Sequence, residues 1–241
     1  MTKFDQHGYA AERPIRQEKW FDFFKGSPPG RFIGNGTIPP GMLVVQNYLD
    51  PAWCDALVKE CETMGGNRHA TGKLHDDGTL EEVESKARVS EAIGASQLNL
   101  DVIETVRNVY QSVVQPHFQT KLEWFETPEV LRYREGGEYI MHSDAYNWKP
   151  DEKIWKRAID RDFSLLLYVN DDFEGGAIYF PNCDFALKPS RGLLVAFPSD
   201  WRYIHMARPV TSGVRYAIVS WAAAVGGPRA NNTPPPLSIM M

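Results

Sequence analysis

Three residues have the types and the spacing of metal ligands: His142, Asp144 and His205. Only Ser143 separates His142 from Asp144, and on a β-strand residues i and i+2 project from the same face. The imidazole and the carboxylate should therefore lie side by side, with Ser143 directed away. Two His and one carboxylate on one side of a metal ion form the facial triad of non-haem Fe(II) sites, which leaves the remaining coordination positions open.

An arginine close to the third candidate ligand indicates that an anion binds nearby. Residues 211–213 form a turn signal, after which a strand is expected from Val214 to Trp221. One face of that strand would carry alternate residues, namely Arg215, Ala217, Val219 and Trp221. A guanidinium on an otherwise apolar face is costly unless it meets an anion, and the planar fork of Arg215 suits a carboxylate.

Several further motifs follow one another in a fixed order. They are segment 133–144 with its tyrosines, glycines and His-x-Asp, the apolar run 161–170, the Gly-Gly segment 175–181, segment 188–197, and a closing set of His205, Pro209, Val210, Gly213 and Arg215. With these motifs the chain resembles, from about Leu43 to Trp221, the prolyl 4-hydroxylase type of Fe(II)/2-oxoglutarate dioxygenases.

The resemblance implies both a fold and a ligand set. The fold would be mostly β with supporting helices, built on a double-stranded β-helix, which is a jelly-roll or cupin-like core. Fe(II) would be held by the three candidate ligands, and 2-oxoglutarate would bind it through the 1-carboxylate and the 2-keto oxygen. The distal carboxylate would pair with Arg215 and the hydroxyl of Tyr168, and Tyr133 would line the same pocket. O₂ would complete the reactants, with ascorbate in support.

The implied reaction is hydroxylation of an unactivated C–H bond with release of succinate and CO₂. Asp144 argues against the halogenating branch, in which a small residue replaces the carboxylate to admit halide. Tyr139, Trp221 and Arg88 are expected to line the site or to touch substrate. Tyr133, Tyr139 and Trp221 are explained equally well as ordinary core aromatics.

Three functions remain open at this stage. The protein would hydroxylate a prolyl residue in a peptide or protein, or oxidise a free amino acid or another small metabolite, or bind metal or ligand without catalysis. The triad together with Arg215 and Tyr168 disfavours the non-catalytic alternative. An open groove beside segments 67–96 and 145–162 would favour a peptide, and a closed pocket a metabolite. Nothing in the sequence indicates an oligomeric state.

Composition indicates an ordinary globular protein. The chain has 241 residues, 43% of them hydrophobic and 24% charged, which is enough for one domain with a sizeable core. A formal net charge of −5 argues against nucleic-acid binding. The three cysteines are too few for a disulfide framework, and no apolar run has the length of a membrane span or of a signal peptide. A cytoplasmic location is therefore expected.

Periodicity predicts the elements around the site. Helices are expected at 51–64, where Asp50 is the N-cap and Gly65 follows, and at 98–114, which Pro116 should end. Short strands, separated by Gly and Pro, are expected at 43–49, 122–125, 130–134, 138–142, 163–169, 177–180, 184–187, 193–197, 203–206 and 214–221.

The remaining segments carry weaker signals. Segment 67–96 is polar and should be a solvated loop or a flap, in which His69 and His75 are solvated rather than ligands. Segment 145–162 should be a solvated connection or a lid. The expected organisation is an N-terminal extension packed on the core (1–37), one dioxygenase domain (38–225) and a Pro-rich tail without packed elements (226–241). The aromatic residues at 20–24 should dock on the core, with a partner-binding motif as the alternative.

Overall fold

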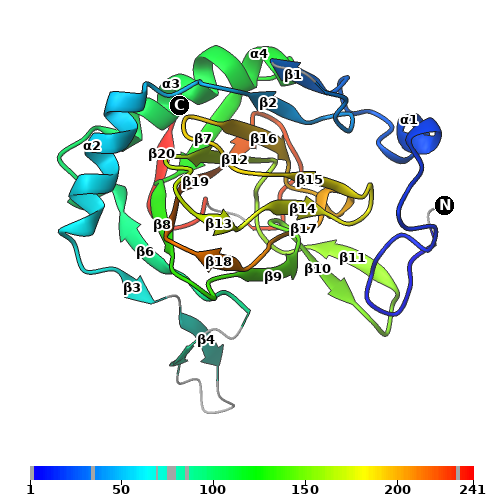
Figure 1. Ribbon diagram of the computed structural model, residues 1–241. Helices are drawn as coiled ribbons and strands as arrows, with labels where there is room; N and C mark the ends of the chain where they lie inside the picture. The colour runs from blue at the N-terminus through cyan, green and yellow to red at the C-terminus, as the bar shows by residue number, and fades with distance from the viewer. Residues whose placement is uncertain (1–2, 34–35, 69, 75–79, 85–86, 232–233) are drawn as a thin grey trace.

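Two sheets contribute to the walls of one central cavity, and helices cover the outer face of the larger sheet (Figure 1). The computed structural model describes residues 3–33, 36–68, 70–74, 80–84, 87–231 and 234–241. The larger sheet has ten strands in the order β1–β2–β16–β12–β19–β8–β6–β3, with β7 and β20 attached beside β19. The smaller sheet has the order β15–β14–β17–β9. This arrangement confirms the predicted mostly β, jelly-roll-like fold.

The strands are short and mostly antiparallel. Those of the larger sheet are β1 (Arg31–Ile33), β2 (Leu43–Val45), β3 (Asn67–Arg68), β6 (Glu91–Gly94), β7 (Leu122–Glu126), β8 (Glu129–Tyr133), β12 (Phe163–Tyr168), β16 (Leu194–Pro198), β19 (Arg215–Ala224) and β20 (Ser238–Met240). Those of the smaller sheet are β9 (Tyr139–His142), β14 (Ile178–Phe180), β15 (Phe185–Leu187) and β17 (His205–Ala207). Separate pairs are β4 (Ala70–Leu74) with β5 (Leu80–Glu84), β10 (Tyr146–Lys149) with β11 (Ile154–Arg157), and β13 (Glu174–Gly175) with β18 (Val210–Ser212).

The predicted strands are present, and three of them have an end that lies two or more residues from the prediction. The strand expected at 214–221 begins at Arg215 and continues to Ala224. The strand expected at 43–49 stops at Val45, and Asn47 turns the chain with a positive φ of 53°. The strand expected at 203–206 begins only at His205. The preceding residues Trp201–Tyr203 form a 3-10 turn instead, because the side chain of Asp200 accepts a hydrogen bond from the N–H of Arg202.

Alternation along the two central strands divides the interior into two sides. On β12, Leu165 and Leu167 belong to the apolar core beneath the helices, whereas Ser164, Leu166 and Tyr168 line the central cavity. The neighbouring strand β19 follows the same rule. Its residues Tyr216, Ile218 and Ala222 are buried in that core, and its residues Arg215, Ala217, Val219 and Trp221 line the cavity, as the sequence predicted.

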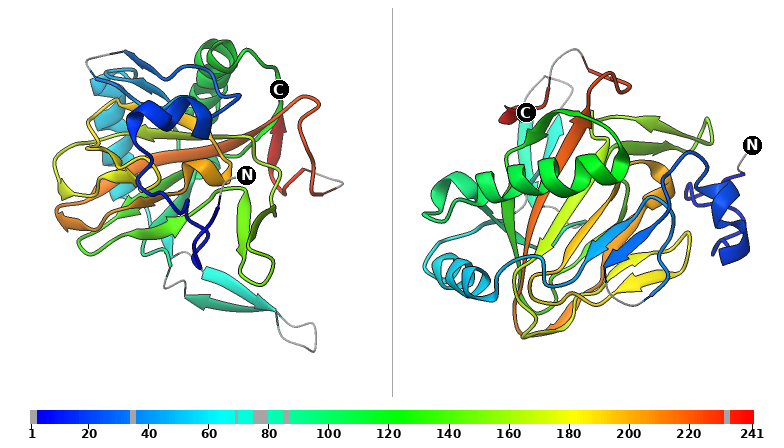
Figure 2. Two further views of the ribbon diagram at one scale, coloured as in Figure 1. Left: turned by 90° about the vertical axis from the view of Figure 1, so that its right-hand side faces the viewer. Right: turned by 90° about the horizontal axis from the view of Figure 1, so that it is seen from above.

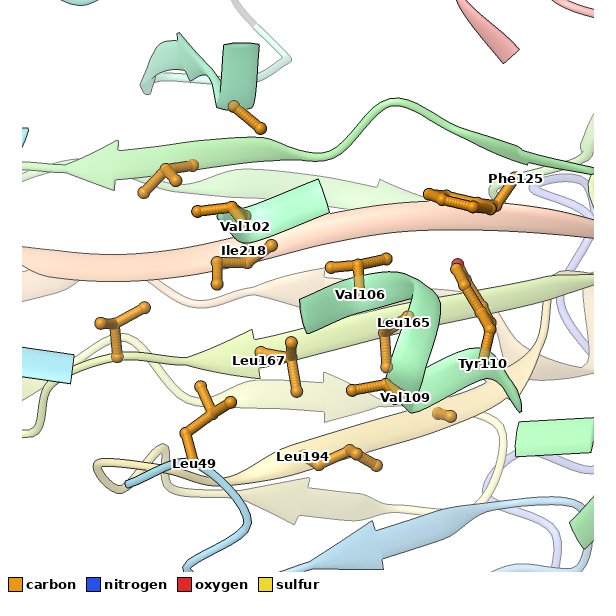
Figure 3. Packing of buried hydrophobic residues seen from close by; sticks show 14 of the residues in the cluster. Leu49, Val102, Val106, Val109, Tyr110, Phe125, Leu165, Leu167, Leu194 and Ile218 are labelled. Atoms are coloured by element: carbon orange, nitrogen blue, oxygen red, sulfur yellow. The ribbon is translucent and has the colours of Figure 1, made fainter. Parts of the chain in front are cut away.

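The helix α3 (Val102–Val109) lies across the outer face of the larger sheet (Figure 2, right). It begins after Asp101, whose carboxylate accepts a hydrogen bond from the N–H of Glu104. Its stripe of Val102, Val106 and Val109 is completely buried and packs over β12 and β19 (Figure 3). The helix thereby holds the back of the strands that carry the cavity residues.

The prediction that Pro116 ends this helical segment was wrong. A π-type turn at Tyr110–Val114 follows α3, and α4 (Gln115–Phe118) continues through Pro116. The π-type turn directly before the proline is wider than an α-helical turn and makes room for its ring. The segment ends at Gln119, which adopts the left-handed conformation with φ 50°.

Segments 67–96 and 145–162 contain more regular structure than predicted. β6 is part of the larger sheet through its pairing with β8, and its Ile93 is completely buried. The strands β10 and β11 form a hairpin in which Trp148 lies opposite Trp155. Tertiary partners therefore order stretches whose own composition is polar. His69 and His75 lie outside the described residues.

The N-terminal segment binds the β10–β11 hairpin. The indole N–H of Trp155 donates to the carbonyl of Gly8 at 2.6 Å, and that of Trp148 donates to the carbonyl of Gln6 at 3.2 Å. The ring of Phe4 packs edge-on against Trp148. Further along, Phe24, which follows the short helix α1 (Trp20–Phe23), is buried against the ring of Tyr203.

The prediction of a tail without packed elements was wrong at its end. β20 pairs antiparallel with β7, and Ile239 packs against the core under the helices. Upstream, Arg229 binds the carboxylate of Glu123 at 2.6 Å, and the buried Asp160 accepts hydrogen bonds from the main-chain N–H groups of Ala230 and Asn231. These non-local contacts compensate for the poor local propensity of the Pro-rich sequence.

Among the described residues, no helix combines the length and the apolar character that crossing a membrane would require.

The N-cap of helix α2 (Pro51–Glu62) provides a test of local stability. The carboxylate of Asp50 accepts hydrogen bonds from the N–H groups of Ala52 at 2.9 Å and Trp53 at 3.0 Å. Asp50→Ala should lower the free energy of unfolding by about 1 kcal/mol, because both donors lose their acceptor. Asp50→Asn should stay close to the wild type, since Asn also caps. Equal losses in the two variants, measured by chemical denaturation, would contradict this role.

Candidate metal and cosubstrate site

The three candidate ligands meet at the edge of the smaller sheet. His142 ends β9 and His205 begins β17, and the two are direct partners in the antiparallel register, so their side chains are neighbours. Asp144 follows in the bend after β9. Its Oδ1 lies 3.5 Å from Nε2 of His142, and its Oδ2 lies 3.8 Å from Nε2 of His205. One ligand atom from each residue lies within 4.8 Å of the others, which is the spacing of a metal site.

The backbone orients both imidazoles with Nε2 toward this centre. Nδ1 of His142 lies 2.8 Å from the carbonyl oxygen of Ile140, and Nδ1 of His205 lies 3.0 Å from that of Tyr203. A carbonyl oxygen only accepts, so each Nδ1 carries the proton and each Nε2 presents a lone pair. This arrangement, in which a carbonyl fixes the tautomer, is typical of metal-binding histidines.

The electrostatics of the cluster favour the ligand forms of its members. Burial, and then the neighbouring His142, lower the pKa of His205 to about 4, so its imidazole is neutral at physiological pH. Burial opposes ionisation of Asp144, but the His205 and His142 imidazoles and the Arg161 guanidinium hold the pKa of its carboxyl well below its usual range. A neutral imidazole and an ionised carboxylate are the states that coordinate a divalent cation.

Arg215 lines the same cavity, and its buried guanidinium has the surroundings of an anion-binding group. Its side chain is 2% exposed, and one Nη donates to the carbonyl of Gly176. Within the described part of the chain its Nε has no hydrogen-bond partner and no carboxylate pairs with it. Because a buried, unpaired guanidinium is costly, this position fits the carboxylate of a ligand.

The surroundings of Arg215 shape a carboxylate pocket. Gly176 has a positive φ of 62°, and a Cβ there would lie 3.3 Å from Cδ of Arg215, so glycine permits the close approach. The ring of Tyr133, its direct strand partner, lies 4.0 Å from the guanidinium carbon. Tyr168 lines the same cavity, and burial raises the pKa of its hydroxyl to about 12 against the opposing charge of Arg215. That hydroxyl is therefore protonated and able to donate to an anion.

The mouth of the cavity carries the other expected site residues. The ring of Tyr139 stacks on that of His142 with the centroids 3.6 Å apart. The guanidinium carbon of Arg88 lies over the ring of Tyr139, 5.1 Å from its centroid. Trp221 lines the cavity from β19. The structure thus brings together all the residues that the sequence analysis proposed for metal, cosubstrate and lining.

Several polar residues that support the ligands were missed by sequence reasoning. The hydroxyl of Ser164 donates to Oδ2 of Asp144 at 2.6 Å. The hydroxyl oxygen of Ser199 lies 2.7 Å from that of Ser164, within hydrogen-bond distance. Arg161 forms a two-pronged pair with Glu126 at 2.5 and 2.6 Å and donates to the main-chain oxygen of Asp144 at 3.3 Å. The one available signal was Ser164 itself, a polar residue on the inward face of an apolar strand.

The residues fit Fe(II) and 2-oxoglutarate. His142, Asp144 and His205 would hold the metal from one side. Arg215 and the Tyr168 hydroxyl would hold the distal carboxylate of the cosubstrate, while the apolar residues between the two ends exclude water. When bound, the metal and cosubstrate supply O₂-dependent oxidation of a C–H bond.

Comparison with known proteins agrees with this site. Residues 128–223 match the family model of the 2OG-Fe(II) oxygenase superfamily. A putative prolyl 4-hydroxylase of Acanthamoeba polyphaga mimivirus is 26% identical over 188 residues, covering 74% of this chain and 72% of the viral protein. Human prolyl 3-hydroxylase 2 is 29% identical over 144 residues, covering 53% of this chain but only 20% of the human protein.

A solved structure shares the fold. A prolyl hydroxylase from Trichoplax adhaerens, in complex with a peptide fragment of the hypoxia-inducible factor oxygen degradation domain, superposes with a TM-score of 0.57. The identity is 19%, and the match covers 76% of this chain and 83% of the other. Residues 128–223 therefore match the 2OG-Fe(II) oxygenases, and the chain is similar to proteins of the prolyl 4-hydroxylase type, as the sequence motifs predicted.

Removal of a metal ligand should abolish metal binding without unfolding the protein. In His142→Ala and Asp144→Ala we expect Fe(II) retention and Fe(II)-dependent succinate formation to fall to background, because two ligands alone hold the ion weakly. His117→Gln is the control, since His117 lies on α4, away from the cluster. Wild-type metal content and turnover in either ligand variant would remove these residues from the site.

The cosubstrate pocket is tested by the 2-oxoglutarate dependence of succinate release. Arg215→Ala should weaken the apparent affinity by about 30- to 4,000-fold, which corresponds to the loss of roughly 2–5 kcal/mol when a buried charge loses its partner. Arg215→Lys should be intermediate, because it keeps the charge and loses the fork. Tyr168→Phe should weaken 2-oxoglutarate binding by roughly 1.5–3 kcal/mol, because it removes one hydrogen bond to the charged carboxylate.

Bound Fe(II) should be retained in all three variants, since neither residue is a ligand. An Arg215→Ala protein with unchanged 2-oxoglutarate dependence would contradict the pocket assignment.

Proposed function

We propose that this protein is an Fe(II)- and 2-oxoglutarate-dependent hydroxylase that acts on a prolyl residue within a peptide or protein. The observation that supports the choice of substrate is a pair of open depressions that adjoin at the metal ligand His142 and together form the proposed substrate groove. The alternative of a free amino acid or another small metabolite would be better served by a closed pocket.

The groove is built from segments that are far apart in the sequence. On one side of the triad an opening of about 270 Å³ is lined by the N-terminal residues His7 and Tyr9 together with the β10–β11 hairpin. On the other side an opening of about 490 Å³ extends to the C-terminal residues Pro236 and Leu237. Both openings are lined by His142, Ser143 and Asn147. The two openings therefore adjoin at the metal ligand His142, and in this proposal an extended peptide lies across both.

The site residues have distinct roles in this proposal. His142, Asp144 and His205 coordinate the metal, while Arg215 and Tyr168 orient the cosubstrate by binding its distal carboxylate. Tyr139 and Trp221 form the walls between the metal and the groove, where the substrate residue enters.

Two comparisons support a peptidyl proline. The mimivirus and human relatives are named as prolyl hydroxylases, and the Trichoplax structure of the same fold holds a peptide. Ascorbate is expected to prolong turnover, in keeping with the chemistry of the proposed class.

A substrate screen tests the proposal. Purified protein with Fe(II), 2-oxoglutarate and ascorbate should release succinate when Pro-containing peptides are added, and mass spectrometry should show one added oxygen atom on the proline. Free L-proline and other free amino acids should give background rates. The Asp144→Ala protein is the control for metal-independent release. Turnover of free amino acids with none of the peptides would overturn the proposed substrate class.

A further inference from the structure

The carboxylate of Glu129 lies in the groove and forms no ion pair with another described residue. Glu129 opens β8, and in the period of a strand it shares the face of Leu131 and Tyr133, which line the cavity. It is the register partner of Val219, two residues before Trp221 on β19. Glu129 is half-buried and lines the same opening as Trp221, His142 and Asp144.

The other charged residues of this opening are already engaged. Glu126 is paired with Arg161 in the two-pronged contact, Asp144 is a candidate metal ligand, and Arg88 lies over the ring of Tyr139 and has further contacts. Glu129, by contrast, makes no side-chain hydrogen bond or ion pair within the part of the chain that the structure describes. The Glu129 carboxylate is therefore available to a cationic group of a ligand that lies in this opening.

An apolar rim from the C-terminal tail borders the same opening. Pro236 and Leu237 line it together with Ile159. The Leu237 side chain is 81% exposed, and its φ of 62° lies in the left-handed region that leucine rarely adopts. Thr127 holds this conformation, because its N–H at 3.3 Å and its hydroxyl at 2.5 Å both donate to the carbonyl of Leu237. The backbone of Leu237 is thus held in place, and its aliphatic side chain lies on the surface of the groove.

We propose that Glu129, Pro236 and Leu237 form a subsite for a lysine or arginine side chain that flanks the hydroxylated residue of the substrate. Such a side chain has an aliphatic stem and a cationic head. The stem would pack on the tail residues, and the head would bind the Glu129 carboxylate in a charge-assisted hydrogen bond. This inference rests on the proposed peptide hydroxylase function and adds a sequence preference to it.

Paired peptides test the subsite. Short peptides with one central proline would carry lysine, norleucine or glutamate at the flanking positions in an otherwise identical sequence. The wild type should prefer the lysine peptide over the norleucine peptide by about 10-fold in kcat/KM, mostly through KM, and over the glutamate peptide by more. The preference should shrink as ionic strength rises, because the pair is partly exposed.

Two variants separate recognition from structure. Glu129→Gln should remove the preference for lysine while leaving turnover of the norleucine peptide and the 2-oxoglutarate dependence unchanged, and Glu129→Lys should shift the preference to the glutamate peptide. Glu135→Gln is the matched control, since Glu135 is exposed just beyond the other end of β8 and does not line the opening.

The outcomes that overturn the subsite differ from those that overturn the function. Equal turnover of lysine and norleucine peptides by the wild type, or an equal loss on both in Glu129→Gln, would refute the subsite while peptide hydroxylation stands. Turnover of free amino acids without any peptide turnover would refute the proposed function and the subsite together.

Discussion

The direct pairing of β9 with β17 is the constraint on which the site depends. It places His142 opposite His205, although the two residues come from distant parts of the chain. Each imidazole is also anchored through Nδ1 to a backbone carbonyl two residues earlier in the chain, that of Ile140 in β9 and that of Tyr203 in the turn before β17. The strand register therefore sets the position of the two ligands, and these local contacts set their tautomers. A slip of one residue would turn one imidazole to the opposite face and destroy the cluster.

The larger sheet supplies the residues of the cosubstrate pocket, whereas the smaller sheet carries the two histidines of the metal site. Its strands β12 and β19 each bury one face under α3 and present the other to the cavity. The helix side is apolar and rigid, which allows the cavity side to hold costly groups such as the unpaired guanidinium of Arg215 and the hydroxyl of Ser164. The apolar core thus offsets the cost of a preorganised polar site.

Both terminal segments shape the surroundings of the metal site. The N-terminal residues bind the indoles of the β10–β11 hairpin, and the C-terminal strand β20 positions Leu237 beside the opening. Arg161 connects these regions to the centre, because it binds Glu126, supports the main chain of Asp144 and lies 3.8 Å over the ring of Trp221. Changes at either end of the chain are therefore expected to alter substrate selection more than cosubstrate binding.

The sequence by itself determined the features that depend on local spacing. The i, i+2 relation of His142 and Asp144, the inward face of β19 and the N-cap at Asp50 all follow from the period of a strand or the unpaired N–H groups at the start of a helix. The order of the motifs was sufficient to predict the family and the mostly β fold.

The tertiary structure alone decided which distant groups meet. Ser164 as a partner of Asp144, the Arg161–Glu126 pair, the passage of the helix through Pro116 and the packing of the Pro-rich tail on β7 depend on register and on burial against other elements. No local pattern encodes these contacts, because a polar residue or a proline is disfavoured by its own segment and is stabilised only by neighbours that the folded chain brings to it.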